Sequence, residues 1–176
     1  MVNGIERRGA VAEIRAAGRR LEGYAAVYGV EARIGSIVET IAPGAFAVTL
    51  AERNDVLGLA DHDPARLLAR TRSGTLRLSE DSRGLAFDLD VPDTQTGRDV
   101  LALAERNDLG GMSFAFRVRP DGERWSGKKR ELRSLDLVEI SVVSSWPAYD
   151  GTSVTARSLI LSPARAALRS FLEARQ

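Results

Sequence analysis

The sequence contains no cysteine and a single histidine, His62, among its 176 residues. The absence of cysteine excludes disulfides, thiolate catalysis and cysteine-based metal sites. A single histidine also excludes, within one chain, a zinc site built on two or three histidines. Any chemistry that needs an imidazole near neutral pH must therefore use His62.

Long apolar runs and an excess of one charge are also missing. No apolar run reaches the ~20 residues of a membrane span, and the start, MVNGIERRGAVAEIR, lacks the apolar core of a signal peptide. The 25 basic and 24 acidic side chains nearly cancel, so the chain has no general attraction to nucleic acid or to a membrane surface. We therefore expect a cytoplasmic protein with neither kind of partner.

The composition, 44% apolar and 28% charged, is typical of a globular protein of one domain. Residues 1–8 look like a loose start. Alternating or apolar segments bounded by turn residues predict strands. They lie at 9–17, 20–29, 35–41, 55–63 (stopped by Pro64), 67–74, 75–92 (interrupted by a turn at 81–84), 111–119 and 121–143, the last a polar hairpin followed by a buried strand. Helical spacing predicts helices over 45–53, 95–106 and from Pro163 onward.

Numerous short strands with few helices predict a mainly β fold (α+β). We expect an antiparallel sheet, closed or nearly closed into a barrel, with the helices on its outside. We divide the chain into an N-terminal segment that joins the barrel (1–19), a barrel domain (20–158) and a C-terminal helical tail (159–176).

Ser113 lies on a strand with two different faces. In Gly110-Gly-Met-Ser-Phe-Ala-Phe-Arg-Val-Arg119, alternation places Met112 and Phe114 on an apolar face. Ser113 and Ala115 lie on the opposite face, where the hydroxyl has space around it. The serine is either packing filler or a nucleophile.

Two other strands carry partners that a nucleophilic serine needs. His62 shares a face with the small residues Gly58 and Ala60, and Glu139 shares a face with Ser141. If these strands are neighbours, a serine, a histidine and a carboxylate converge, which is the set used in acyl transfer. Histidine would accept the serine proton, and the carboxylate would fix the histidine tautomer.

Each residue also has a structural interpretation. A strand serine is usually filler, a lone histidine usually lies on the surface or has a structural role, and the structural interpretation of Glu139 is a salt bridge to Arg117 or Arg119. A metal site at Asp61-His62-Asp63 is disfavoured, because adjacent strand residues point to opposite faces. We expect no metal and no cofactor. The G-x-S-x-G signature of α/β-hydrolases is absent.

Five segments together resemble the prohead (capsid maturation) serine proteases of tailed phages and phage-derived gene transfer agents. The resemblance covers roughly residues 20–155 and rests on GYAAVYG (23–29), ETIAPGAF (39–46), LADHDPARLLART (59–71), DTQTGRDVLALAERNDLGGMSFAFRV (93–118) and LVEISVVSSWPAY (137–149). It implies a fold similar to the herpesvirus assembly protease, a mostly antiparallel barrel ringed by helices.

The resemblance also implies roles for three residues. His62 matches the histidine of the family's "HD" motif, Ser113 the serine of "GMSF", and Glu139 the acidic residue of "LxEVS". Ala69 and Ala115 depart from the pattern, because they stand where the family has glycines. Backbone amides of Gly110 and Gly111, or of the 144–149 loop, are candidates for the oxyanion hole. Arg70 and Ser141 are further candidates for contacts with the substrate or the oxyanion.

The implied activity is cleavage of the major capsid protein precursor or of scaffold inside the immature shell, in the cytoplasm of the bacterial host. The resemblance also implies self-cleavage near the termini and a homo-oligomer, with a dimer as the expected form. The alternative function is an assembly module with the same barrel that has lost catalysis.

Overall fold

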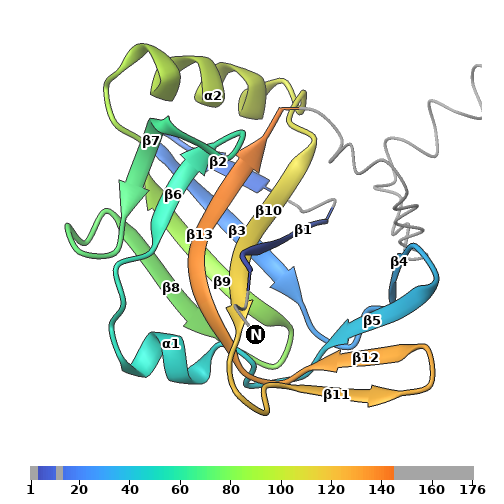
Figure 1. Ribbon diagram of the computed structural model, residues 1–176. Coiled ribbons are helices and arrows are strands. Elements are labelled where there is room, and N and C mark those ends of the chain that lie inside the picture. The colour runs from blue at the N-terminus through green and yellow to red at the C-terminus, as the bar shows by residue number, and fades with distance from the viewer. Residues whose placement is uncertain (1–3, 11–13, 145–176) are drawn as a thin grey trace, which may run out of the picture.

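The computed structural model describes residues 4–10 and 14–144 (Figure 1). Within these residues the strands form three sheets. Two helices accompany them, α1 (Ala47–Ala51) and α2 (Gln95–Glu105). The strands are β1 (Glu6–Ala10), β2 (Ile14–Ala17), β3 (Arg20–Val27), β4 (Ala32–Ile34), β5 (Ile37–Ile41), β6 (Leu57–Ala60), β7 (Asp63–Arg70), β8 (Leu76–Glu80), β9 (Gly84–Asp90), β10 (Gly111–Val118), β11 (Glu123–Ser126), β12 (Lys129–Leu132) and β13 (Leu135–Val143).

The largest sheet has the order β1-β10-β13-β6-β7. Strand β10 runs antiparallel to both β1 and β13, whereas β13 runs parallel to β6. The second sheet has the order β2-β3-β9-β8 and the third β11-β12-β5-β4. Figure 1 shows α1 and α2 near opposite ends of the strands, with the β11–β12 hairpin beside β4 and β5.

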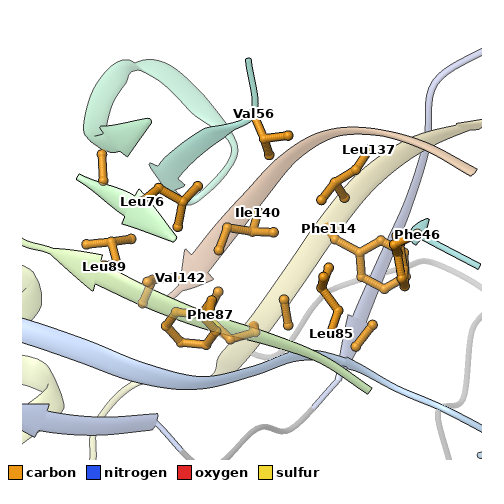
Figure 2. Packing of buried hydrophobic residues seen from close by; sticks show 14 of the residues in the cluster. Phe46, Val56, Leu76, Leu85, Phe87, Leu89, Phe114, Leu137, Ile140 and Val142 are labelled. Atoms are coloured by element: carbon orange, nitrogen blue, oxygen red, sulfur yellow. The ribbon is translucent and has the colours of Figure 1, made fainter. Parts of the chain in front are cut away.

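The core lies between the first two sheets (Figure 2). On β9, Leu85, Phe87 and Leu89 are buried and alternate with residues that are partly exposed. From the facing sheet, Phe114 contacts Phe46 edge to face, with 5.6 Å between the ring centroids. The apolar face expected for the Ser113 strand is therefore confirmed. Because this face packs into the core, Ser113 lies on the opposite face of β10.

A buried threonine joins α1 to the start of β13. The Thr49 hydroxyl donates to the Leu135 carbonyl oxygen (2.7 Å) and accepts from the Leu137 N–H (3.0 Å). Thr49 is 1% exposed, so water cannot replace either bond. The helix therefore holds the strand that carries Glu139.

The mainly β class is confirmed, but a closed barrel is not found among the pairings of residues 4–10 and 14–144. Three details differ from expectation. Residues 6–8 are not a loose start, because they begin β1. The strand expected at 55–63 ends at Ala60, and Pro64 lies inside β7. Strand β7 is an edge strand, where a missing backbone N–H is tolerated.

The helix expected at 95–106 is confirmed as α2, and the one expected at 45–53 is present as the shorter α1. The helix expected from Pro163 onward lies outside the described residues. The division into segments 1–19, 20–158 and 159–176 stays a prediction. Neither α1 nor α2, the helices of the described ranges, is long and apolar enough to cross a membrane.

Replacing Thr49 by valine should destabilise the protein by about 1–3 kcal/mol, because the buried Leu135 carbonyl and Leu137 amide each lose a partner. Chemical denaturation would measure the free energy of unfolding. The neighbouring exposed Val48 gives a matched control, and Val48→Thr should change that free energy by less than about 0.5 kcal/mol. Equal stability of Thr49→Val and wild type would contradict this account.

Candidate active site

Three polar side chains share the face of β10 and β13 that is turned away from the core. Ser113 lies opposite Ser141, and Ala115 lies opposite Glu139. Directly opposite residues of an antiparallel pair project to the same face. The Ser141 hydroxyl donates to Glu139 Oε2 at 2.8 Å, which confirms that these two residues share a face. Strand pairing alone therefore places a serine hydroxyl and a carboxylate on adjacent strands.

His62 reaches this face from a turn and not from a strand. Gly58 and Ala60 pair with Ile140 and Val142, whose side chains belong to the core. The face expected for His62, shared with Gly58 and Ala60, is thus the wrong one. The chain leaves β6 after Ala60 and takes a turn that changes the direction of the next side chains.

The turn is built from two residues in the left-handed region, with φ of 53° at Asp61 and 58° at His62. This conformation is uncommon for residues other than glycine, although aspartate tolerates it better than most. It brings His62 Nδ1 to 2.5 Å from Glu139 Oε1. An ionised carboxylate only accepts, so this contact with an ionised Glu139 requires the proton on Nδ1 and leaves Nε2 as the acceptor.

Asp61 fixes the turn through four contacts. Its N–H donates to the Val142 carbonyl (2.9 Å), and its carboxylate accepts from the Ser144 N–H (2.7 Å), the Ser144 hydroxyl (3.1 Å) and Arg66 Nη1 (2.5 Å). Burial would raise the pKa of Asp61, but the bonds from Ser144 and Arg66 outweigh it and lower the pKa. Sequence reasoning considered Asp61 only as a metal ligand and missed this anchoring role.

Glu139 is buried, at 5% exposure, and both carboxylate oxygens are occupied. Its partners are His62, Ser141 and, at 3.9 Å, Arg7 Nε. Arg119 binds Asp136 and Glu52 instead. An ion pair with Arg117 or Arg119 is therefore not what holds this carboxylate in the described part of the chain.

The Ser113 hydroxyl contacts β1. Ser113 is fully buried, and its Oγ donates to the Arg8 carbonyl oxygen at 2.9 Å. Gly9 is the residue of β1 directly opposite it. Within residues 4–10 and 14–144, no hydrogen bond joins Ser113 to His62. The structure thus brings His62 and Glu139 together, with Ser113 on the adjacent strand covered by β1.

Several candidates for the oxyanion hole or for substrate contacts bind other groups of the protein. The Gly110 N–H donates to the Val143 carbonyl (2.8 Å), and the Arg70 guanidinium binds Asp55. Gly111 opens β10 with φ of 146°. Of the 144–149 loop only Ser144 is described, and its amide is used by Asp61. A role of Gly110, Gly111, Arg70 or the loop in an oxyanion hole or in substrate binding stays a prediction.

The charged side chains near His62 do not form a metal site. Among the described residues, no group of three or more histidine, aspartate or glutamate side chains is arranged to hold a metal ion. Asp61 faces Ser144 and Arg66, whereas His62 faces Glu139. The Asp61 carboxylate therefore stabilises the turn that carries His62.

Comparison with known proteins gives one match. The family model for the caudovirus prohead serine protease matches residues 9–164, which include every residue of the site described above except those of the first part of β1. No curated protein and no solved structure matches the chain.

Asp61→Ala should loosen the His62 turn and lower the free energy of unfolding by roughly 1–3 kcal/mol at neutral pH. The lone histidine makes the imidazole NMR spectrum unambiguous, and the protected Nδ1 proton signal should weaken in the variant. Because the folded pKa of Asp61 is lowered, its contribution is full above the ordinary aspartate pKa of about 3.9 and is lost as the pH falls below it.

The control for this variant is Asp63→Ala, on the other side of His62. Among the described residues, the Asp63 carboxylate accepts only from the nearby Ala65 N–H (2.9 Å), and no hydrogen bond joins it to Ser144 or Arg66, the partners of Asp61. It should leave the Nδ1 proton signal in place. An unchanged signal in Asp61→Ala as well would rule out the anchoring role.

Proposed function

The chain belongs to the caudovirus prohead serine proteases, the serine endopeptidases of phage capsid maturation, and we propose that Ser113, His62 and Glu139 carry out its reaction. The observation that carries this assignment is the 2.5 Å contact between His62 Nδ1 and Glu139 Oε1. That contact leaves Nε2 free to act as a base, on the sheet face that also bears Ser113.

The proposed reaction has two halves. Ser113 Oγ attacks the carbonyl carbon of a peptide bond while His62 Nε2 takes the hydroxyl proton. The C–N bond then breaks, and His62 returns the proton to the leaving amine. A water molecule attacks the acyl-serine ester, again losing a proton to His62, and the carboxyl product leaves as Ser113 regains its proton.

Glu139 acts as the group that orients His62 and stabilises its cation when the proton is held there. The buried position strengthens this interaction, because few water molecules screen it. We propose Ser141 as a positioning residue, because its hydroxyl holds the second oxygen of Glu139 at 2.8 Å. Its role is to keep the carboxylate from rotating away from the imidazole.

We propose the major capsid protein precursor or a scaffold protein as the substrate, cleaved inside the assembling shell in the bacterial cytoplasm. Self-cleavage and a homodimer are part of the same proposal. The family membership supports a capsid protein as the substrate class. An assembly module without catalysis remains as the outcome if purified protein leaves the capsid precursor intact.

Ser113→Ala should lower cleavage of the capsid protein precursor at least about a thousandfold, because no other group replaces the nucleophile. Incubation of the purified full chain with the precursor, followed by mass spectrometry of the products, measures this. The same spectra report cleavage of the protease itself. Undiminished cleavage by Ser113→Ala would refute the assignment.

Glu139→Gln should lower kcat by up to about 10⁴-fold, because an amide donor opposite Nδ1 favours the tautomer that protonates Nε2. Ser141→Ala should have a smaller effect on kcat, since it removes only a support of Glu139. The control Glu131→Gln changes a partly exposed glutamate that pairs with Arg133, and its kcat should match wild type. Equal kcat for Glu139→Gln and Glu131→Gln would exclude the orienting role.

A further inference from the structure

The nucleophile of a protein-cleaving enzyme must reach the backbone of another chain, yet Ser113 is 0% exposed. The segment that covers it is β1, an edge strand that pairs antiparallel with β10. Extended peptides commonly bind enzymes and other proteins by adding a strand to a sheet edge. Strand β1 therefore occupies the place that a substrate strand needs.

We propose that β1 holds the position of the substrate and that Arg8 marks the residue whose carbonyl is attacked, so that Glu39 selects arginine on the amino side of the cleaved bond. This inference rests on the proposed role of Ser113 as the nucleophile. It adds to that role the direction of the bound peptide, a preference for arginine before the cleaved bond, and Glu39 as the residue that recognises this arginine.

The backbone of β1 supplies the first argument. The carbonyl in contact with the Ser113 hydroxyl, at 2.9 Å, is that of Arg8. The next residue, Gly9, lies directly opposite Ser113 and has no side chain on the face that carries the hydroxyl. The peptide bond between Arg8 and Gly9 thus corresponds in position to the bond that would be cleaved in a substrate.

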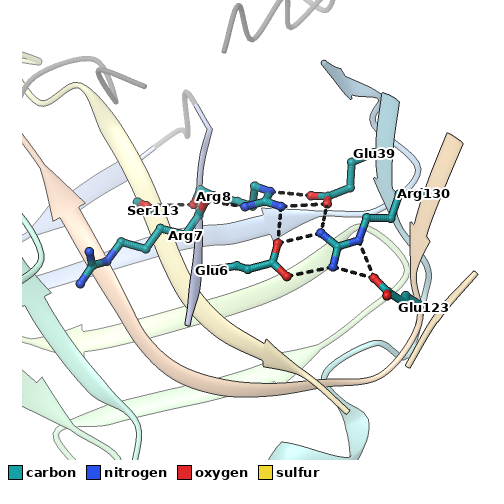
Figure 3. Close-up of polar contacts among 7 residues, drawn as sticks. All are labelled: Glu6, Arg7, Arg8, Glu39, Ser113, Glu123 and Arg130. Carbon is teal, nitrogen blue, oxygen red and sulfur yellow. Dashed lines mark hydrogen bonds and ion pairs between the residues drawn. The ribbon is translucent and has the colours of Figure 1, made fainter. Parts of the chain in front are cut away.

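The side chain of Arg8 supplies the second argument (Figure 3). Its Nε and Nη2 lie 2.6 and 2.9 Å from the two carboxylate oxygens of Glu39. This bidentate geometry favours arginine over lysine. Glu39 comes from β5 and is 2% exposed. The guanidinium also lies 5.5 Å from the centre of the Phe116 ring, within the range of a cation–π contact.

The charges that remain without β1 supply the third argument. Glu6 and Arg8 would leave together, and Glu39, Glu123 and Arg130 would stay, so two carboxylates would face one guanidinium. Arg130 Nη1 lies 2.9 Å from Glu39 Oε2, which leaves Oε1 without its partner. A buried carboxylate oxygen without a donor is costly, and an incoming arginine would restore the lost bonds.

The same network explains how β1 stays in place. Glu6 accepts two bonds from Arg130, at 2.7 and 2.8 Å, and these bonds lower its pKa against the opposing effect of burial. Arg8 and Glu6 also bind each other at 2.6 Å. Figure 3 shows Arg7 pointing away from this cluster, so alternate residues of β1 have separate surroundings.

The test uses the full chain and synthetic fluorogenic peptides that repeat residues 4–10, GIERRGA, with one change. The residue equivalent to Arg8 is arginine in one peptide and citrulline in the other, which has nearly the same shape but no charge. We expect kcat/KM to be at least about tenfold higher for the arginine peptide. Glu39→Gln should reduce this ratio toward one, and the partly exposed control Glu131→Gln should leave it unchanged.

Because Glu39→Gln alters a buried side chain, a loss of activity in it would not separate misfolding from a lost contact. A second variant tests the inference without changing Glu39. Arg8→Ala leaves Glu39 and Arg130 in place but removes the competing arginine of β1. It should raise kcat/KM several-fold for both peptides and keep the arginine preference. A fall in kcat/KM for both peptides would show that β1 is needed for activity, which overturns its role as a stand-in for the substrate.

Failure of this inference differs from failure of the proposed function. Cleavage that requires Ser113 but treats arginine and citrulline alike overturns the role of Glu39 and leaves the nucleophile assignment intact. Cleavage that survives Ser113→Ala overturns both. A third outcome is cleavage of the capsid precursor but of neither peptide. In that case the cleavage sites in the precursor are mapped by mass spectrometry of the products. Arginine at the new carboxyl termini supports the inference, and any other residue there contradicts it.

Discussion

The buried carboxylate of Glu139 is the constraint on which the site depends. An ionised carboxylate at 5% exposure is unfavourable unless donors surround it. The central strand β13 supplies one donor itself, Ser141, and its neighbour β6 leads directly into the turn that delivers His62. Because β13 lies between β10 and β6, one strand sets the distance from the carboxylate to the base and to the serine face. Thr49 fixes the start of the same strand through its hydrogen bonds with the Leu135 carbonyl and the Leu137 N–H.

Sequence reasoning succeeded where side-chain alternation decides the outcome. The shared face of Glu139 and Ser141, and the apolar face opposite Ser113, follow from a period of two along single strands. His62 was placed on the wrong face because alternation ends at Ala60, and a left-handed turn is not visible in a hydrophobic pattern. The adjacent aspartate, a residue type that tolerates this conformation, was the signal available in the sequence.

The first part of strand β1, residues 6–8, is not predicted by the sequence for a different reason. Its sequence, ERRGA, has no apolar alternation, and it is held by ion pairs with residues far away in the chain, Glu39 on β5 and Arg130 on β12. Closure into a barrel was likewise beyond local patterns, since these indicate where strands occur but not how their edges pair. The polar character of such segments predicts a loop when read alone and a strand only when the distant partners are known.

The position of β1 at a sheet edge also bears on solubility. A strand edge with unpaired N–H and C=O groups is a template for pairing with other chains, and proteins that leave such edges bare tend to aggregate. Strand β10, whose residues are nearly all buried, would be an edge of this kind without β1. The charged strand β1 therefore covers a largely buried edge, and a chain without β1 would expose both the β10 edge and Ser113 and should aggregate more readily.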